Sequence, residues 1–178
     1  TMAVDAYIWL KGGTNGVKVE GETNDDAMSK NKAIEVLSYS LSASNPINVG
    51  SATGGLTAGK ADFSGLTIMH QVDTASAELC KALAQGEHFT DMTMLVRRSG
   101  GKNPNTYVQF EFKKVFVANV NFSGSNGEET LVQSTTFEWG AVKYHYFALG
   151  SDGKQVSSPK EFVWSRVNNK AAHTAEKK

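Results

Sequence analysis

Residues 106–122 read TYVQFEFKKVFVANVNF, and residues 131–149 read LVQSTTFEWGAVKYHYFAL. In the first stretch Phe110 and Phe112 alternate with polar neighbours such as Glu111, and the second stretch alternates in the same way. Alternation with a period of two is typical of β-strands that have one face on the core and the other in water. The segment between the two stretches, SGSNGEET, is rich in turn formers. We therefore expect antiparallel β-structure to dominate this half of the chain.

Shorter stretches outside this pair also have strand character: residues 33–42, 62–72 and 91–98. The alternation in the first long stretch changes phase at Val115. A bulge or bend at that point would let a sheet close on itself.

Residues 76–86, SAELCKALAQG, are the one convincing helix. We expect Ser76 to be its N-cap, Glu78 to lie in its first turn and Gly86 to end it. The apolar stripe of this helix is narrow, so the helix can cover one side of a sheet but cannot form a core by itself.

The two ends of the chain carry further strand signals. Residues 6–10 and 17–22 flank the turn sequence KGGTNG and predict a hairpin. Near the C-terminus, alternation predicts a final strand that ends close to Asn168. We expect one domain over residues 1–168 and a frayed tail at residues 169–178.

The stretch at residues 33–42, AIEVLSYSLS, has two contrasting faces. The core face is expected to carry Leu37, Tyr39 and Leu41, and the other face carries Ser38, Ser40 and Ser42. The serine face is thus expected to be exposed to solvent but uncharged.

Residues 43–61, ASNPINVGSATGGLTAGKA, contain four glycines and no sustained period. They predict a long loop without regular structure, and loops of this length are usually functional or disordered. Ile47, Val49 and Leu56 are spaced apolar residues that a purely solvating loop does not need, so we expect something to cover them.

Gly54, Gly59 and Lys60 in that loop match the G-x-x-x-x-G-K spacing of phosphate-binding loops. Three requirements of such a site are missing. No apolar strand leads directly into the glycines, Ala61 stands where Ser or Thr would hold magnesium, and the residues that follow favour a strand over a helix. We expect no nucleotide site.

The composition restricts the class of protein. The chain has 178 residues, 40% of them hydrophobic, which suits one core of ordinary size. Its 18 Lys and Arg residues balance its 18 Asp and Glu residues, so the positive field that attracts nucleic acid is missing. The single cysteine, Cys80, rules out an intramolecular disulfide and a cysteine-rich zinc site and fits a reducing compartment.

The N-terminal sequence has no pattern of a cleaved signal peptide, and no apolar run approaches the length of a membrane span. We expect a protein that is made in the cytoplasm, does not insert into membranes, and is exported, if at all, without a cleaved signal.

No catalytic, cofactor or metal site is expected. The four histidines are scattered along the sequence, without an i, i+4 pair on a helix or a cysteine partner, and we expect each at the surface or a strand edge: His70, His88, His145 and His173. No nucleophile elbow is present, and the pairs of acidic residues lie in turn-like segments.

In their order and spacing, these features resemble the Hcp family, the haemolysin-coregulated tube proteins of the bacterial type VI secretion system. The resemblance covers nearly the whole chain. The segments that carry it are AVDAYIWLKG, VEGE, IEVLSYS, the glycine-rich segment ending in AGK, VDTASAELCKALAQGEHF, MLVRRSGGKNP, YVQFEFKKVFVANVNFSGSNGEET, FEWGAVKYHY and FVWSRVNN. The departures are modest; for example, Tyr39 stands where tryptophan is common in the family.

The resemblance implies a closed β-barrel of two antiparallel sheets with one flanking α-helix and a long extended loop at about residues 43–61. It also implies homohexameric rings that stack into a tube. A contractile sheath expels that tube, tipped by a trimeric spike, and effector proteins travel in the ring channel. The expected partners are therefore further copies of this chain, sheath proteins, the spike and effectors, and the expected destination is the extracellular space or a target cell.

Two sets of residues acquire roles from the resemblance. The extended loop reaches the adjacent ring, and its expected stacking residues are Asn45, Pro46, Ile47, Val49, Gly54, Gly55, Leu56, Thr57, Ala58, Gly59 and Lys60. Ser40 matches a position that faces the channel and contacts cargo, with Ser38 and Ser42 beside it.

Two other functions fit the same sequence. One is a chaperone or receptor for effectors that works as free rings, and the other is a small monomeric β-barrel binding module. An enzyme is not expected, because the residues after Tyr146 are too few for an added toxin domain.

Overall fold

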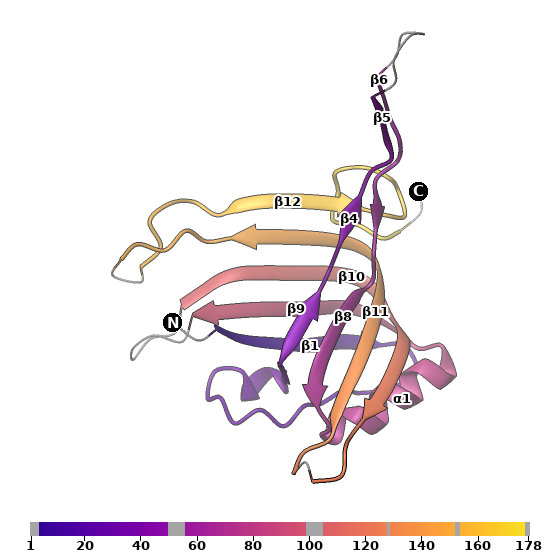
Figure 1. The fold of residues 1–178 in the computed structure, drawn as a ribbon, viewed down its shortest axis with the longest axis vertical. Coiled ribbons are helices and arrows are strands. Elements are labelled where there is room, and N and C mark those ends of the chain that lie inside the picture. Colours follow the sequence, from indigo (N-terminus) through magenta and orange to yellow (C-terminus); the bar gives the residue numbers. More distant parts are fainter. Residues whose placement is uncertain (1–3, 50–55, 99–104, 128, 152–153, 177–178) are drawn as a thin grey trace.

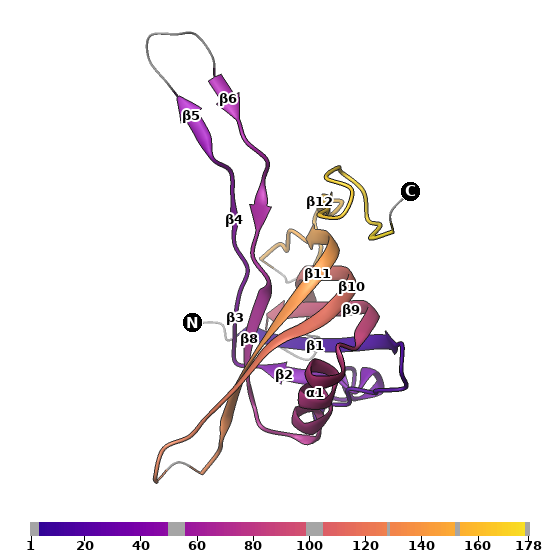
Figure 2. The same cartoon turned by 90° about the vertical axis from the view of Figure 1, so that its right-hand side faces the viewer.

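The computed structural model describes residues 4–49, 56–98, 105–127, 129–151 and 154–176 (Figure 1, Figure 2). Its elements, in chain order, are β1 (Val4–Gly13), the 3-10 helix η1 (Ser29–Asn31), β2 (Ile34–Val36), β3 (Ser38–Ser40), β4 (Ala43–Ser44), β5 (Ile47–Val49), β6 (Leu56–Ala58), β7 (Asp62–Phe63), β8 (Leu66–Gln71), α1 (Thr74–Gln85), β9 (His88–Arg98), β10 (Asn105–Ser123), β11 (Val132–Tyr146) and β12 (Lys160–Ser165).

Antiparallel pairing links eight of these strands into one sheet that curls into a barrel. The order is β2-β1-β9-β10-β11-β8-β3, and β12 adds to β11. The end strands β2 and β3 are separated in the chain only by Leu37, whose N–H donates to the carbonyl oxygen of Met69 at 2.7 Å. One continuous segment therefore pairs with both ends of the sheet and closes it. This closed, mainly β barrel with one flanking helix confirms the predicted fold class.

The predicted long strands form the hairpin of β10 and β11, paired from Val108 opposite Tyr146 to Ser123 opposite Val132. Strand β10 is irregular on both sides of Val115. Lys114 has a φ of 54°, and the register against β11 shifts between Val117 and Asn119. The bend predicted from the change of phase is thus confirmed.

Alternate residues of the strands build the core inside the barrel. On β8, Leu66 and Ile68 are completely buried, whereas Met69 is 42% exposed on the outer face. Helix α1 packs on the barrel and buries Ala75, Leu79 and Ala82, among others.

The N-cap of α1 is Asp73, not Ser76 as predicted. The Asp73 carboxylate accepts a hydrogen bond from the N–H of Ala75 at 3.0 Å, and the Ser76 hydroxyl accepts one from the N–H of Asp73 at 3.1 Å. The prediction was wrong because the helix starts at Thr74, which makes Ser76 the reciprocal partner in a capping box. The predicted end is confirmed: Gly86 has a φ of 62° and caps the C-terminus.

The predicted N-terminal hairpin is wrong. Strand β1 pairs with β9 along one edge and, from Ala6 to Ile8, with β2 along the other, so β2 is its partner there and residues 17–22 form no strand. Val17 and Val19 are nevertheless buried in the main core.

The residues after β12 fold back onto the barrel. The Ser165 hydroxyl donates to the carbonyl oxygen of Thr174 at 2.6 Å, and His173 Nε2 lies 3.0 Å from the carbonyl oxygen of Glu111. Ala175 is buried. The described part of the tail, as far as Glu176, therefore differs from the frayed segment that we expected, because side-chain hydrogen bonds and a buried methyl group hold it.

Candidate functional site

The segment between β3 and β8 is a two-stranded ribbon that projects from one end of the barrel (Figure 1, Figure 2). Strand β4 pairs with β7, and β5 pairs with β6. Between these pairs, the N–H of Gly59 donates to the carbonyl oxygen of Pro46 at 3.0 Å. The expectation of a loop without regular structure was wrong, because pairing of the two backbones satisfies their polar groups whatever the side-chain pattern. We call residues 43–63 the arm.

The arm contains the described members of the predicted stacking set, which are distributed along both of its strands. They are Asn45 and Pro46 between β4 and β5, Ile47 and Val49 in β5, Leu56, Thr57 and Ala58 in β6, and Gly59 and Lys60 beyond it. Gly54 and Gly55 lie outside the described residues. The predicted absence of a helix after the glycines is confirmed, because β6 and β7 follow them.

An aromatic cluster holds the arm where it leaves the barrel. The ring centroid of Phe63 lies 5.7 Å from that of Trp139, 6.1 Å from that of Phe162 and 6.3 Å from that of Trp164. These four residues form the root cluster, which joins the arm to β11 and β12. The sequence alone gives a signal only for Phe162 and Trp164, which alternate on β12; their partners come from remote segments.

Ser42 lies at the root of the arm, apart from the other two predicted serines. Its N–H donates to the hydroxyl of Ser64 at 2.9 Å, and its carbonyl oxygen accepts from the N–H of Ser64 at 2.9 Å. This reciprocal pair closes the ribbon next to the barrel.

Ser38 and Ser40 lie on the outer face of the barrel, where their neighbours on three further strands are also uncharged. Residues directly opposite one another on paired strands share a face of a sheet. The register gives two rows across β3, β8, β11 and β10: Ser40, Thr67, Thr136 and Asn119 in one, and Ser38, Met69, Ser134 and Asn121 in the other. The Thr67 and Thr136 hydroxyls are hydrogen-bonded at 2.9 Å. We call these eight residues the uncharged wall. Only its two serines were found from the sequence.

The core face predicted for residues 37–41 is only partly correct. Leu41 packs against the core, but Leu37 is 58% exposed and Tyr39 is 39% exposed. The strand bends at Leu37 as it changes partner from β1 to β8, and Ile34 and Val36 supply the buried side chains instead.

His70 is completely buried, which corrects the expectation of a histidine at the surface. Its Nδ1 lies 2.9 Å from the carbonyl oxygen of Gln71, and its Nε2 lies 3.2 Å from the Thr135 hydroxyl. Burial lowers the pKa of the imidazole because a charged ring would lose its hydration. Within the described part of the chain, no three His, Cys, Asp or Glu residues are grouped so that they could hold a metal ion.

Across the described ranges, no helix has the length and apolar character that crossing a bilayer requires.

Comparison with known protein families matches residues 7–146 to the family described as "Type VI secretion system effector, Hcp". Protein hcp1 of Pseudomonas aeruginosa is 28% identical to this chain over 110 residues, which are 62% of this chain and 68% of that protein. The matched family region contains both the arm and the uncharged wall.

Solved structures agree with this match. A structure of a type six secretion system protein is 30% identical, with a TM-score of 0.85 over 94% of this chain and 99% of the other. Hcp1 from Salmonella typhimurium is 27% identical, with a TM-score of 0.72 over 96% of this chain and 100% of the other.

Proposed function

This chain belongs to the Hcp family of type VI secretion system proteins, and on that premise we propose that it is the structural subunit of the secretion tube. In this role it forms hexameric rings that stack into the inner tube, and a contractile sheath expels the tube behind a trimeric spike. Effector proteins are carried in the ring channel. The protein leaves the cytoplasm as part of the expelled tube and needs no catalytic group.

One observation carries the proposal: the same barrel has both a projecting arm and an uncharged wall. The wall lies across four strands and ends where β3 and β8 continue into the arm. A wall without charges offers hydrogen bonds to cargo while exerting no strong electrostatic hold, so that a polypeptide can be both carried and released. These features support a channel lining made by Ser38, Ser40 and their neighbours.

The arm supports the stacking half of the proposal. Its described strands pair only with each other, and it carries an exposed apolar residue, Ile47, at 62% exposure. Such ribbons recognise partners through main-chain pairing and a few apolar side chains. In such a contact one subunit contributes its arm and the subunit of the next ring binds it. Repeated along the axis of the tube, this head-to-tail contact never closes on itself, so it produces a filament.

The test compares the wild type with a variant that has a shortened arm. Residues 47–58 are replaced by Asn-Gly, a turn that suits the two-residue connection left between the hydrogen-bonded Pro46 and Gly59. Size-exclusion chromatography with light scattering measures ring mass, and negative-stain microscopy measures stacking. We expect hexameric rings from both proteins and stacks from the wild type alone.

The two alternatives give different results in the same experiment. Single rings from the wild type at every concentration would favour a chaperone or receptor for effectors. A monomeric wild type at high concentration would contradict the tube and leave a β-barrel binding module.

A further inference from the structure

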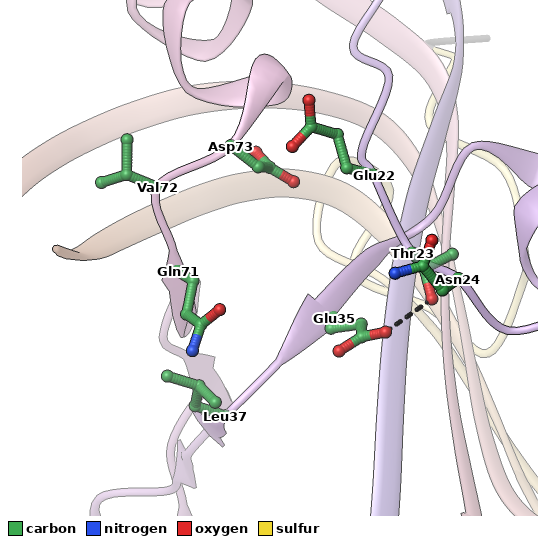
Figure 3. A pocket seen from close by; sticks show the side chains of 8 residues that line it. All are labelled: Glu22, Thr23, Asn24, Glu35, Leu37, Gln71, Val72 and Asp73. Atoms are coloured by element: carbon green, nitrogen blue, oxygen red, sulfur yellow. Dashed lines mark hydrogen bonds between the residues drawn. The ribbon is translucent and has the colours of Figure 1, made fainter. Parts of the chain in front are cut away.

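A groove opens at the end of the barrel opposite the arm, where β8 ends and α1 begins (Figure 1, Figure 3). Three segments line it. Glu22 comes from the irregular segment after β1, Glu35 and Leu37 come from the closing segment, and Val72 and Asp73 come from the turn between β8 and α1. Figure 3 shows these side chains around the opening.

The groove is acidic. Its lining contains the carboxylates of Glu22, Glu35 and Asp73 and no lysine or arginine. Glu35 accepts a hydrogen bond from the Thr23 hydroxyl at 2.7 Å, and Asp73 caps α1. In the described ranges none of these carboxylates forms an ion pair with a lysine or arginine. The opening therefore presents carboxylates that no lysine or arginine of the described residues neutralises.

One side of the groove carries two exposed apolar residues, Leu37 and Val72, with Gln71 between them (Figure 3). Leu37 is 58% exposed and Val72 is 38% exposed. The N–H of Val72 donates to the carbonyl oxygen of Leu131 at 3.0 Å, and Leu131 is itself 58% exposed. Exposed apolar side chains beside a polar opening are typical of a surface that another protein covers, and an ion alone would not need them.

The arm is complementary to this groove. Lys60 is the only basic residue of the arm, whose other charged residue is Asp62 in β7. In the described part of the chain Lys60 has no ion-pair partner, and Ile47 is 62% exposed. Both views place the arm at one end of the molecule and the turn between β8 and α1 at the other (Figure 1, Figure 2).

We propose that the groove receives the arm of a second copy of this chain, with Lys60 directed to its carboxylates and Ile47 to Leu37 and Val72. The inference rests on the proposed stacking and names its acceptor surface. Because donor and acceptor lie at opposite ends, each subunit uses its arm toward one neighbour and its groove toward the other.

A charge swap tests the contact. Lys60→Glu and Glu22→Lys are each made alone and then together; Glu22 is chosen because Asp73 caps a helix and Glu35 bonds Thr23. We expect each single variant to form intact rings and to lower the stacking equilibrium about tenfold or more, since it places like charges in contact. The double variant should restore most of the stacking that each single variant loses. Lys170→Glu and Glu176→Lys, which change exposed residues of the tail, are the matched controls and should stack like the wild type.

Crosslinking gives a second, geometric readout. In a Cys80→Ser background, Lys60→Cys and Glu22→Cys are combined and treated with a short bismaleimide. We expect a ladder of covalent oligomers, because the two sites of one chain lie at opposite ends and can meet only between chains. The combination of Lys60→Cys with Glu176→Cys should give no ladder.

The outcomes separate this inference from the proposed function. If the wild type fails to stack, the tube proposal fails. If the wild type stacks while the charge variants also stack normally and no ladder forms, the tube proposal stands and the groove is not the acceptor.

Discussion

Phe63 at the root of the arm and Phe162 on β12 are stacked, with ring centroids 6.1 Å apart and planes inclined by 30°. The two residues come from segments that are far apart in the sequence, and their contact ties the projecting ribbon to the body of the barrel. Trp139 adds an edge-to-face contact with Phe63, in a pair inclined by 69°. The direction of the arm thus depends on side chains that lie outside the arm's own pairing.

Replacing Phe63 by alanine should release the arm without opening the barrel. The side chain is half-buried, so we expect a loss of about 1 to 2 kcal/mol in unfolding free energy, less than for a fully buried phenylalanine. The specific effect should be faster hydrogen exchange at Ser42 and Ser64, whose backbone groups close the ribbon. Phe122→Ala, near the turn of β10 and β11, is the control. Unchanged exchange at the root in Phe63→Ala would contradict the anchoring role.

A bulky side chain at Ser40 should block cargo while leaving the ring intact. Ser40 is exposed at the head of a cross-strand row in the uncharged wall, so glutamine there would project into the proposed channel. Misfit of this kind costs about 1 to 3 kcal/mol, which corresponds to a loss of bound cargo of about fivefold to about 150-fold. Co-purification of effectors with Ser40→Gln rings measures the loss, and Ser157→Gln in an exposed loop is the control. Equal cargo on both variants would argue against a channel position for Ser40.

Cargo retention should depend little on salt, because the wall offers no charges to screen. Between about 0.1 and 0.5 M salt we expect less than about a twofold change in retained cargo for the wild type. Ser134→Glu, which adds a charge at the centre of the wall, should make retention salt-dependent. A steep salt dependence in the wild type would mean that charged residues outside the wall hold the cargo.

The parts of the fold that follow local periodicity could be predicted from the sequence. Strands β8, β10 and β11 alternate between core and solvent, and the phase change at Val115 marks the bend. The arm could not be recognised as a ribbon, because neither of its strands packs on a core and its side chains therefore need no period. The helix start was misplaced because Asp73 and Ser76 are both good capping residues, and only the structure shows which one takes the cap.

The candidate site was less accessible to prediction, for a different physical reason. Two of its serines lie on one short strand, but Thr67, Ser134 and Asn121 join them only through the register of strands that are remote in sequence. Local patterns say which residues share a face of one strand and not which strands become neighbours. The root cluster is hidden for the same reason.

The ion pair of Asp25 and Arg97 should make stability depend on pH in the acid range. Arg97 Nη2 lies 2.5 Å from Asp25 Oδ2, and the guanidinium sits 4.7 Å from the centre of the Tyr7 ring. The hydrogen bond from Arg97 lowers the pKa of the Asp25 carboxyl. The pair's contribution is therefore complete above the ordinary aspartate pKa of about 3.9 and disappears as pH falls through the lowered native value.

Asp25→Asn removes this contribution and leaves the buried Arg97 charge without its partner. We expect a loss of about 2 kcal/mol in unfolding free energy at pH 7, because a buried charge without a counter-ion is costly. Urea unfolding of both proteins measures the difference, which should shrink as the pH is lowered toward 2. A difference that stays constant over this range would mean that the pair does not titrate as described.

The contact between Gly140 and Ala175 should make the folded tail sensitive to a single methyl group. A Cβ atom on Gly140 would lie 2.6 Å from the Ala175 Cβ, so Gly140→Ala must push the tail away from β11 or shift the strand. Overpacking of this kind costs about 1 to 3 kcal/mol. The displaced tail would also lose the hydrogen bond between the Ser165 hydroxyl and the Thr174 carbonyl oxygen. We expect limited proteolysis to remove the tail of Gly140→Ala much faster than that of the wild type.

The double variant with Ala175→Gly restores the space between the two backbones and should recover most of the protection from proteolysis. If Ala175→Gly gave no recovery, the cost would lie in the other contacts of the new methyl group, with Val167 after β12 at 3.3 Å and with the Lys113 carbonyl oxygen of β10 at 3.4 Å.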